Sequence, residues 1–164
     1  MQDPIQRREF VKRIGAGAAA GLTVMGQRSA AGSSANNTIS IGCIGTGGRC
    51  RQLMGKLARI ADVRMAAVCD VWDHNLNAAK ELADSDAFVT KQYQEILERE
   101  DIDAVLIGSP DHWHTKMTVD ACHAGKDVYV EKPLTHDLSE GQSVIDAQNK
   151  TKRIVQVGMQ QRSM

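Results

Sequence analysis

The sequence predicts an α/β fold: a doubly wound parallel sheet with helices on both faces, in three layers. From Thr38 to the last residue, apolar runs of strand length alternate with segments of helical period. This alternation is typical of parallel strands joined by right-handed helical crossovers. A glycine cluster follows the first apolar run. A glycine turn after the first of six strands favours the strand order 3-2-1-4-5-6 and a ligand crevice between strands 1 and 4.

Six short apolar runs, bounded by polar or turn residues, are predicted as strands. They cover residues 39–44, 63–69, 87–90, 103–107, 127–131 and 154–158. The segments between them are predicted as helices. The first helix has an apolar stripe with residues three and four apart: Cys50, Leu53, Met54, Leu57 and Ala61. Before the last helix, Asp137 and Glu140 have the spacing of a capping box, and the helix that follows holds Val144 and Ile145.

The glycine turn is suited to binding a dinucleotide. Gly45, Thr46, Gly47 and Gly48 separate the first strand from the first helix. Glycines let the main chain turn tightly and bring its N–H groups close to a pyrophosphate, while the helix directs its positive end at the anion. The third glycine of the usual pattern is replaced by Cys50, so we expect slightly wider packing of helix against strand there. Alternatively, these residues form an ordinary turn between strand and helix.

Asp70 ends the second strand, where a carboxylate can accept hydrogen bonds from the adenosine ribose. It lies 25 residues after Gly45, somewhat beyond the usual spacing of about 20, which one extra helical turn would explain. Alternatively, Asp70 caps the next helix.

Polar residues also follow the fourth predicted strand. Ser109 is a small residue that lets the main chain approach a nucleotide, and Asp111 is placed to cap the next helix. His112 and His114 have an H-x-H spacing, but without a third convergent ligand we predict no metal. Either one histidine hydrogen-bonds locally and the other faces solvent, or one contributes to a pocket beside the nicotinamide.

The fifth strand ends in Glu131 and Lys132. A lysine at this point can reach the reacting end of a ligand in the crevice, and Glu131 could hold the lysine or tune its pKa. The alternative is a surface ion pair.

The N-terminal residues predict export. Arg7 and Arg8 precede Phe10 in a pattern that resembles the twin-arginine signal, and the apolar run 14–25 is too short for a permanent membrane anchor. We therefore expect a signal peptide over 1–31, a linker over 32–37, a nucleotide-binding domain over 38–164 and a periplasmic or extracytoplasmic location. The alternative is a frayed basic terminus.

Charge and cysteine content argue against a nucleic-acid-binding or membrane-binding protein and against a disulfide-rich or metal-binding one. The chain has 20 Lys and Arg and 20 Asp and Glu; residues 32–164 hold 15 and 18 of these. This balance does not indicate a basic surface that would bind nucleic acid or an anionic membrane. The four cysteines lack C-x-x-C spacing, which favours small buried apolar residues over a disulfide framework or a metal site.

Taken in order, these motifs make the family resemblance specific. The glycine turn, Val68-Cys69-Asp70, the loop ending in His114, Glu131-Lys132-Pro133 and the segment Val157–Arg162 resemble the glucose-fructose oxidoreductase / inositol dehydrogenase / MocA family. The resemblance runs from Thr38 to the end of the chain, and the E-K-P triplet is its most distinctive part. Exported members with twin-arginine signals are known in this family.

The resemblance implies NAD(P)-dependent oxidation or reduction of a sugar, polyol or related carbohydrate. The nicotinamide takes hydride from a carbinol carbon, and a protein group removes the hydroxyl proton. Lys132 would be catalytic, binding the substrate hydroxyl and assisting proton movement. The implied cofactor-binding residues are Gly45, Thr46, Gly47, Gly48, Arg49, Asp70, Ser109, His114, Glu131, Lys132 and Gln160.

Several alternatives stay open. Asp70 favours NAD because a carboxylate repels the 2′-phosphate of NADP, but Arg49 or Arg51 could offset that repulsion. Some family members are glycosidases that use tightly held NAD in a transient oxidation at C3, and a non-catalytic nucleotide-binding module is a third possibility. Family members continue into a second, substrate-binding domain, so we expect this chain to be an N-terminal part, inactive alone, of a protein that forms homo-oligomers.

Overall fold

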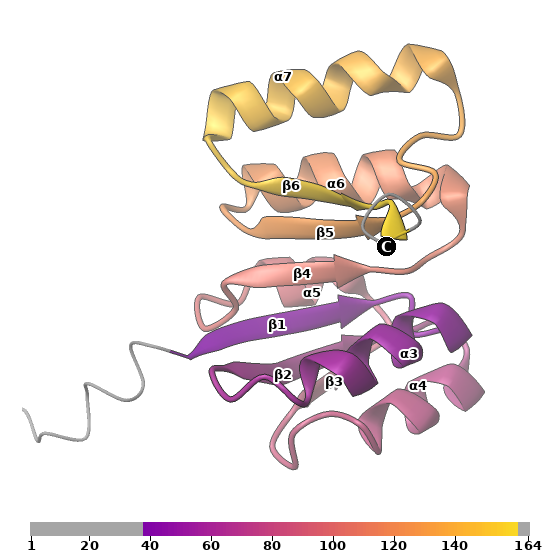
Figure 1. Cartoon of the computed structure of the whole chain (residues 1–164), viewed down its shortest axis with the longest axis vertical. Coiled ribbons are helices and arrows are strands. Elements are labelled where there is room, and N and C mark those ends of the chain that lie inside the picture. Colours follow the sequence, from indigo (N-terminus) through magenta and orange to yellow (C-terminus); the bar gives the residue numbers. More distant parts are fainter. Residues whose placement is uncertain (1–37, 161–164) are drawn as a thin grey trace, which may run out of the picture. The chain divides into compact units, whose positions relative to one another are not determined.

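The computed structural model describes residues 38–160, whose six strands form one parallel sheet in the order β3-β2-β1-β4-β5-β6 (Figure 1). All five pairs of neighbouring strands are parallel. The strands are β1 Ile39–Ile44, β2 Val63–Cys69, β3 Phe88–Thr90, β4 Ala104–Ile107, β5 Asp127–Glu131 and β6 Val155–Gly158. Their order and direction confirm the predicted doubly wound fold. The predicted signal peptide and linker lie outside the described residues.

Helices cover both faces of the sheet, so the predicted three layers are present. The helices are α3 Gly48–Leu57, α4 Asp73–Lys80, α5 Tyr93–Leu97, α6 His114–His123 and α7 Gly141–Thr151, with 3-10 turns η1 Asp111–Trp113 and η2 Leu138–Glu140. In Figure 1, α3 and α4 lie in front of the sheet, and α5 and α6 lie behind it. In the described part of the chain, no helix is both long enough and apolar enough to cross a bilayer.

The core has two sides because successive residues of a strand point to opposite faces of the sheet. On one side, Ile44 and Ile107 pack in a buried cluster with residues of α5, α6 and α7. On the other, Cys43 and Leu106 pack with Met54 of α3. All four cysteines are buried free thiols, as expected of small apolar residues.

The first helix is shorter than its apolar stripe suggests. Cys50 and Met54 are buried, but α3 ends at Leu57 and Ala61 is exposed in the turn that follows. The main chain already bends after the helix, since Ile60 N–H donates to the Leu57 carbonyl and Val63 N–H to the Ile60 carbonyl. Extending the stripe to Ala61 was therefore wrong, because the chain must turn there to enter β2.

The predicted capping box is present before α7. Asp137 accepts a hydrogen bond from Ser139 N–H, and Glu140 accepts one from Asp137 N–H. The capped turn is η2, which leads into α7; Val144 of that helix is buried, whereas Ile145 is half exposed. The sequence signal thus locates the start of the last helical segment.

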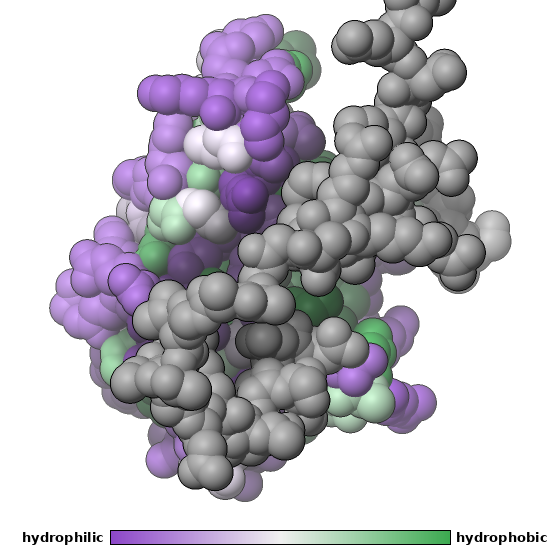
Figure 2. Space-filling view, turned by 90° about the vertical axis from the view of Figure 1, so that its left-hand side faces the viewer, coloured by the Kyte–Doolittle hydropathy of each residue, from purple (hydrophilic) through white to green (hydrophobic). Residues whose placement is uncertain are grey.

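The two edges of the sheet differ. Figure 2 shows the side at which the strands begin; the described residues in view there are mainly hydrophilic, with smaller apolar patches between them. At the opposite edge the strands end, and parallel strands bring their carboxyl ends together there. Figure 1 shows no described helix in front of β5 and β6 along their length. A groove of about 780 Å³ lies there, with Leu53, Tyr129, Val155 and Met159 in its lining.

Candidate functional site

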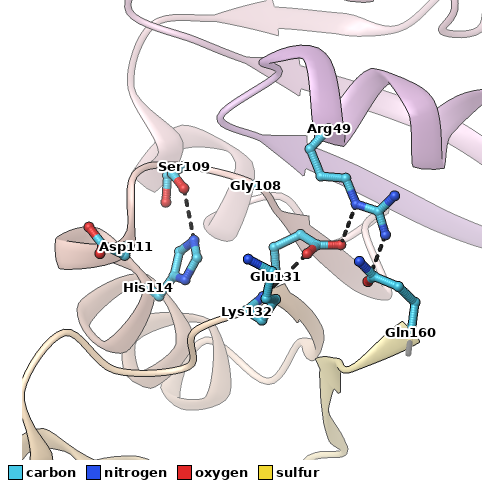
Figure 3. Close-up of a pocket in the computed structure, with 8 residues that line it drawn as sticks. All are labelled: Arg49, Gly108, Ser109, Asp111, His114, Glu131, Lys132 and Gln160. Carbon is cyan, nitrogen blue, oxygen red and sulfur yellow. Dashed lines mark hydrogen bonds and ion pairs between the residues drawn. The ribbon is translucent and has the colours of Figure 1, made fainter. Parts of the chain in front are cut away.

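A cavity of about 310 Å³ opens where β4, β5 and β6 end beside the first turn of α3 (Figure 3). Its lining consists of Arg49, Gly108, Ser109, Asp111, His114, Glu131, Lys132 and Gln160. The structure thus brings six of the predicted site residues together. The other five line no part of this cavity: Gly45, Thr46, Gly47, Gly48 and Asp70. They lie along the turn after β1 and at the end of β2.

The glycines of the turn have different roles. Gly45 has φ +71°, and a Cβ atom there would lie 2.5 Å from the Ser109 Cα. The close approach of the loop after β4 therefore requires glycine at this position. At Gly47 and Gly48, by contrast, an added Cβ would meet nothing within 4 Å. Open space therefore lies beside both residues.

The start of α3 fits an anionic group. Its N-cap is Gly47, no side chain caps the helix, and its first turn contains no acidic residue. The first N–H groups of a helix lack partners within the helix and attract anions. With open space beside Gly47 and Gly48, these features fit the pyrophosphate of a dinucleotide.

Cys50 is accommodated by a glycine on the opposite element. A Cβ atom on Gly108, at the end of β4, would lie 2.8 Å from the Cβ of Cys50. The small residue needed for close packing is thus supplied by the strand rather than by the helix. No local sequence pattern links positions 50 and 108, so sequence reasoning missed the pairing.

Arg49 reaches from α3 to β5 and connects three of the predicted residues. Its Nε lies 2.9 Å from Glu131 Oε1, and its Nη2 lies 2.8 Å from Gln160 Oε1. The Glu131 side chain is only 7% exposed, and a buried carboxylate requires such a partner. Figure 3 shows these contacts at the side of the cavity.

Glu131 contacts Lys132 only through the main chain. Its Oε2 accepts a hydrogen bond of 3.3 Å from the Lys132 N–H. The hypothesis that the carboxylate holds the ammonium group is therefore wrong, because Arg49 is its ionic partner. Within residues 38–160, the Lys132 ammonium group has no ion pair.

His114 ties together the loops after β4 and β5. Its side chain is buried; Nδ1 lies 2.6 Å from the Pro133 carbonyl oxygen, and Nε2 lies 2.8 Å from that of Ser109. A neutral imidazole has one N–H, so it donates to one of these oxygens, and only the doubly protonated ring donates to both. The ring lies between Ser109 and Pro133, the residue that follows Lys132.

Of the other polar residues of this loop, His112 is exposed and Asp111 is partly exposed. Asp111 begins η1 and does not cap α6, whose N-cap is Trp113; the expected capping role was wrong because η1 comes between. The pKa of Asp111 is lowered by His136 and by the N–H of His112. Over residues 38–160, no group of three or more His, Cys, Asp or Glu side chains is arranged to hold a metal ion.

Asp70 lies at the end of β2, as predicted, and is largely buried. Its Oδ1 accepts a hydrogen bond of 2.9 Å from Trp72 N–H, and its Oδ2 lies 3.4 Å from the Thr46 hydroxyl. Trp72 is the N-cap of α4, so the carboxylate supports the entry to this helix. It also lies beside the glycine turn, where a ribose would follow the pyrophosphate.

Comparison with known proteins agrees with this geometry. Residues 39–159 match the family described as "Oxidoreductase family, NAD-binding Rossmann fold" (GFO_IDH_MocA). A glycosyl hydrolase family 109 protein of Solibacter usitatus is 32% identical over 92% of this chain and 38% of its own length. The α-N-acetylgalactosaminidase of Shewanella oneidensis is 30% identical over 70% of this chain and 27% of its own length.

A solved structure shares the fold. Scyllo-inositol dehydrogenase from Lactobacillus casei, with bound NAD(H) and scyllo-inositol, superimposes with a TM-score of 0.70 at 27% identity. The similarity covers 77% of this chain and 38% of that enzyme. The chain therefore spans well under half the length of these relatives.

Proposed function

Because the chain belongs to the GFO_IDH_MocA oxidoreductase family, we propose that it is the cofactor-binding part of an exported NAD(P)-dependent enzyme that oxidises or reduces a sugar, polyol or related carbohydrate. One observation carries the proposal. Lys132 lines the cavity at the carboxyl edge of the sheet, together with Ser109 and His114. This edge is where open α/β sheets bind their ligands.

The bound cofactor would supply hydride transfer. The residues of this chain would bind the dinucleotide and orient it toward the substrate. The first turn of α3 would hold the pyrophosphate, and Asp70 the adenosine ribose. Lys132 would donate a hydrogen bond to the reacting hydroxyl of the substrate and assist movement of its proton. The ammonium group is suited to this role because Glu131 is already paired with Arg49.

Substitution of Lys132 tests the proposal. In the full-length protein, we expect Lys132→Ala to lower kcat by about 10²- to 10⁴-fold, the usual contribution of a positioned acid or base. The affinity for NAD, measured by calorimetry, should change little, because the pyrophosphate site is intact. Lys150→Ala, which removes an exposed lysine of α7, is the matched control. Unchanged turnover of Lys132→Ala would remove the lysine from the mechanism.

A second candidate function is a glycosidase that uses NAD in a transient oxidation, because the curated relatives include a family 109 glycosyl hydrolase and an α-N-acetylgalactosaminidase. The site residues serve both reactions. Net production of NADH from a free sugar or polyol would identify the dehydrogenase. Release of the aglycone from an aryl N-acetylgalactosaminide, with no net NADH, would identify the glycosidase. Binding of NAD without either activity in the full-length protein would leave a non-catalytic module.

We further propose that a second domain completes the active site, since this chain spans 38% of the family 109 relative. That domain would carry the substrate pocket and the proton acceptor, and the full-length protein would be a homo-oligomer. The isolated chain would then bind NAD weakly without turnover. Turnover by the isolated chain would contradict this division of roles.

A further inference from the structure

Two arginines follow the glycine turn, and their side chains have different surroundings. All three side-chain nitrogens of Arg49 have partners: Nε donates to Glu131, Nη2 to Gln160 and Nη1 to Gln52. The guanidinium of Arg49 is thus committed to the side of the site formed by β5 and β6. All three of its nitrogens thus take part in hydrogen bonds that hold the group toward β5 and β6.

Arg51 uses a single nitrogen. Its Nη1 lies 2.6 Å from the Thr46 carbonyl oxygen and 2.9 Å from Asn75 Oδ1. Its Nε and Nη2 have no hydrogen-bond partner among residues 38–160. A guanidinium with free N–H groups in a fixed plane is suited to bind a phosphate through two hydrogen bonds.

Arg51 and Asp70 flank the same threonine. The Thr46 hydroxyl lies 3.4 Å from Asp70 Oδ2 and 3.4 Å from the Asn75 carbonyl oxygen, and its main-chain carbonyl accepts from Arg51. The contacts join the glycine turn, the end of β2 and the first turns of α3 and α4. A ribose held by Asp70 would therefore lie near the guanidinium of Arg51.

We propose that Arg51 and Asn75 set the choice between NAD and NADP at this site. The Asp70 carboxylate accepts hydrogen bonds from the ribose hydroxyls of NAD and repels the 2′-phosphate of NADP. Arg51 offsets that repulsion by donating its unused N–H groups to the 2′-phosphate. The Asn75 amide oxygen holds the guanidinium in place between Thr46 and α4. The inference rests on the proposed dinucleotide site and assigns its selectivity.

Equilibrium binding to the full-length protein tests the proposal without measuring turnover. We expect Arg51→Gln to weaken NADP by about 10-fold or more, the usual effect of losing charged hydrogen bonds, and to change the Kd of NAD less than about 2-fold. Arg51→Lys should recover part of the affinity for NADP. Arg59→Gln removes the same charge from an exposed arginine after α3 and should leave both affinities unchanged.

Two further variants probe the other members of the cluster. Asn75→Asp should weaken NADP selectively, because the new carboxylate pairs with Arg51 and repels the phosphate. Asp70→Ala should weaken NAD more than NADP, because it removes the ribose acceptor and the repulsion together. 2′,5′-ADP and 5′-AMP differ only in the 2′-phosphate, so Arg51→Gln should weaken binding of 2′,5′-ADP and leave that of 5′-AMP unchanged.

The outcomes separate this inference from the function on which it rests. Equal weakening of NAD and NADP by Arg51→Gln would show that Arg51 only supports the turn through Thr46, and would overturn the inference. Unchanged binding of NADP would overturn it as well. If the unsubstituted protein bound neither dinucleotide, the proposed function itself would fail. Thermal unfolding of each variant identifies any that do not fold.

Discussion

Gly45 shows how one residue can be fixed by packing next to a binding site. Its φ of +71° is unfavourable for residues with a Cβ atom, and the loop after β4 occupies the space that a side chain would need. Gly47 and Gly48 stand in open space beside the helix start. A single glycine motif thus combines a structural position with two positions suited to a ligand.

Gly45→Ala should therefore destabilise the fold. A left-handed conformation costs an alanine about 1–2 kcal/mol, and overlap with the main chain of Ser109 adds to that cost. We expect a loss of about 2–4 kcal/mol in the free energy of unfolding, measured by urea denaturation. Gly55→Ala in α3, where a Cβ meets nothing, should instead stabilise the helix by about 0.5–1 kcal/mol. Equal effects of the two variants would refute this assignment.

Elements that meet at the site are joined by side chains rather than by the sheet alone. Arg49 connects α3 to β5 through Glu131, and His114 connects the loops after β4 and β5. Lys132 follows β5 directly, and both links act on its immediate neighbours, Glu131 and Pro133. The position of this lysine thus depends on α3, which carries Arg49, on β5, which carries Glu131, and on α6, which carries His114.

A comparable link joins α6 to the capped turn before α7, and it should respond to pH. Glu140 accepts hydrogen bonds from the Thr115 hydroxyl and the His136 N–H, which lower the pKa of this carboxyl below its ordinary value of 4.5. A carboxyl with a lowered pKa in the folded state stabilises the fold above its unfolded pKa, and the contribution is lost as pH falls through the folded pKa.

Glu140→Gln should accordingly lower Tm at pH 7, and its difference from the unsubstituted protein should shrink below about pH 4.5. Thermal unfolding followed by circular dichroism across this range measures the effect. Glu98→Gln, at an exposed position after α5, should shift Tm little at any pH. A difference for Glu140→Gln that persisted undiminished in acid would contradict the assigned role.

At the scale of the whole molecule, the proposed export and the proposed dinucleotide site are connected. A protein that acquires its dinucleotide in the cytoplasm must cross the membrane folded, and the twin-arginine route carries folded proteins. Arg7 and Arg8 are the residues on which such a signal would depend. The proposed cofactor site and the predicted signal peptide are thus consistent with one another.

Replacing both Arg7 and Arg8 by lysine should abolish export while leaving NAD binding intact. Fractionation of cells that carry residues 1–37 fused to a reporter protein measures the exported fraction. Arg13→Lys, outside the pair, is the control and should export normally. Export of the double variant at the normal level, or in cells without the translocase, would argue against this route.

The sequence predicted much of the fold because its signals are local. The six strands lie within one residue of their predicted bounds, since an apolar run between turn residues carries its own evidence of a buried strand. The capping box before α7 was found for the same reason. The error at Ala61 arose where periodicity continued past the end of the helix, and periodicity does not record where the chain must turn.

The sequence by itself determined the strand order, the turn that opens α3 and the polar residues at the ends of β2, β4 and β5. Which of these side chains meet became clear from the three-dimensional fold. It paired Glu131 with Arg49 rather than with Lys132, set Gly108 against Cys50, and left Arg51 with unused N–H groups beside Asp70. The physical reason is that each pairing joins residues at least 19 positions apart or on separate elements, and a side chain's direction across such a gap is set by the packing of the whole sheet.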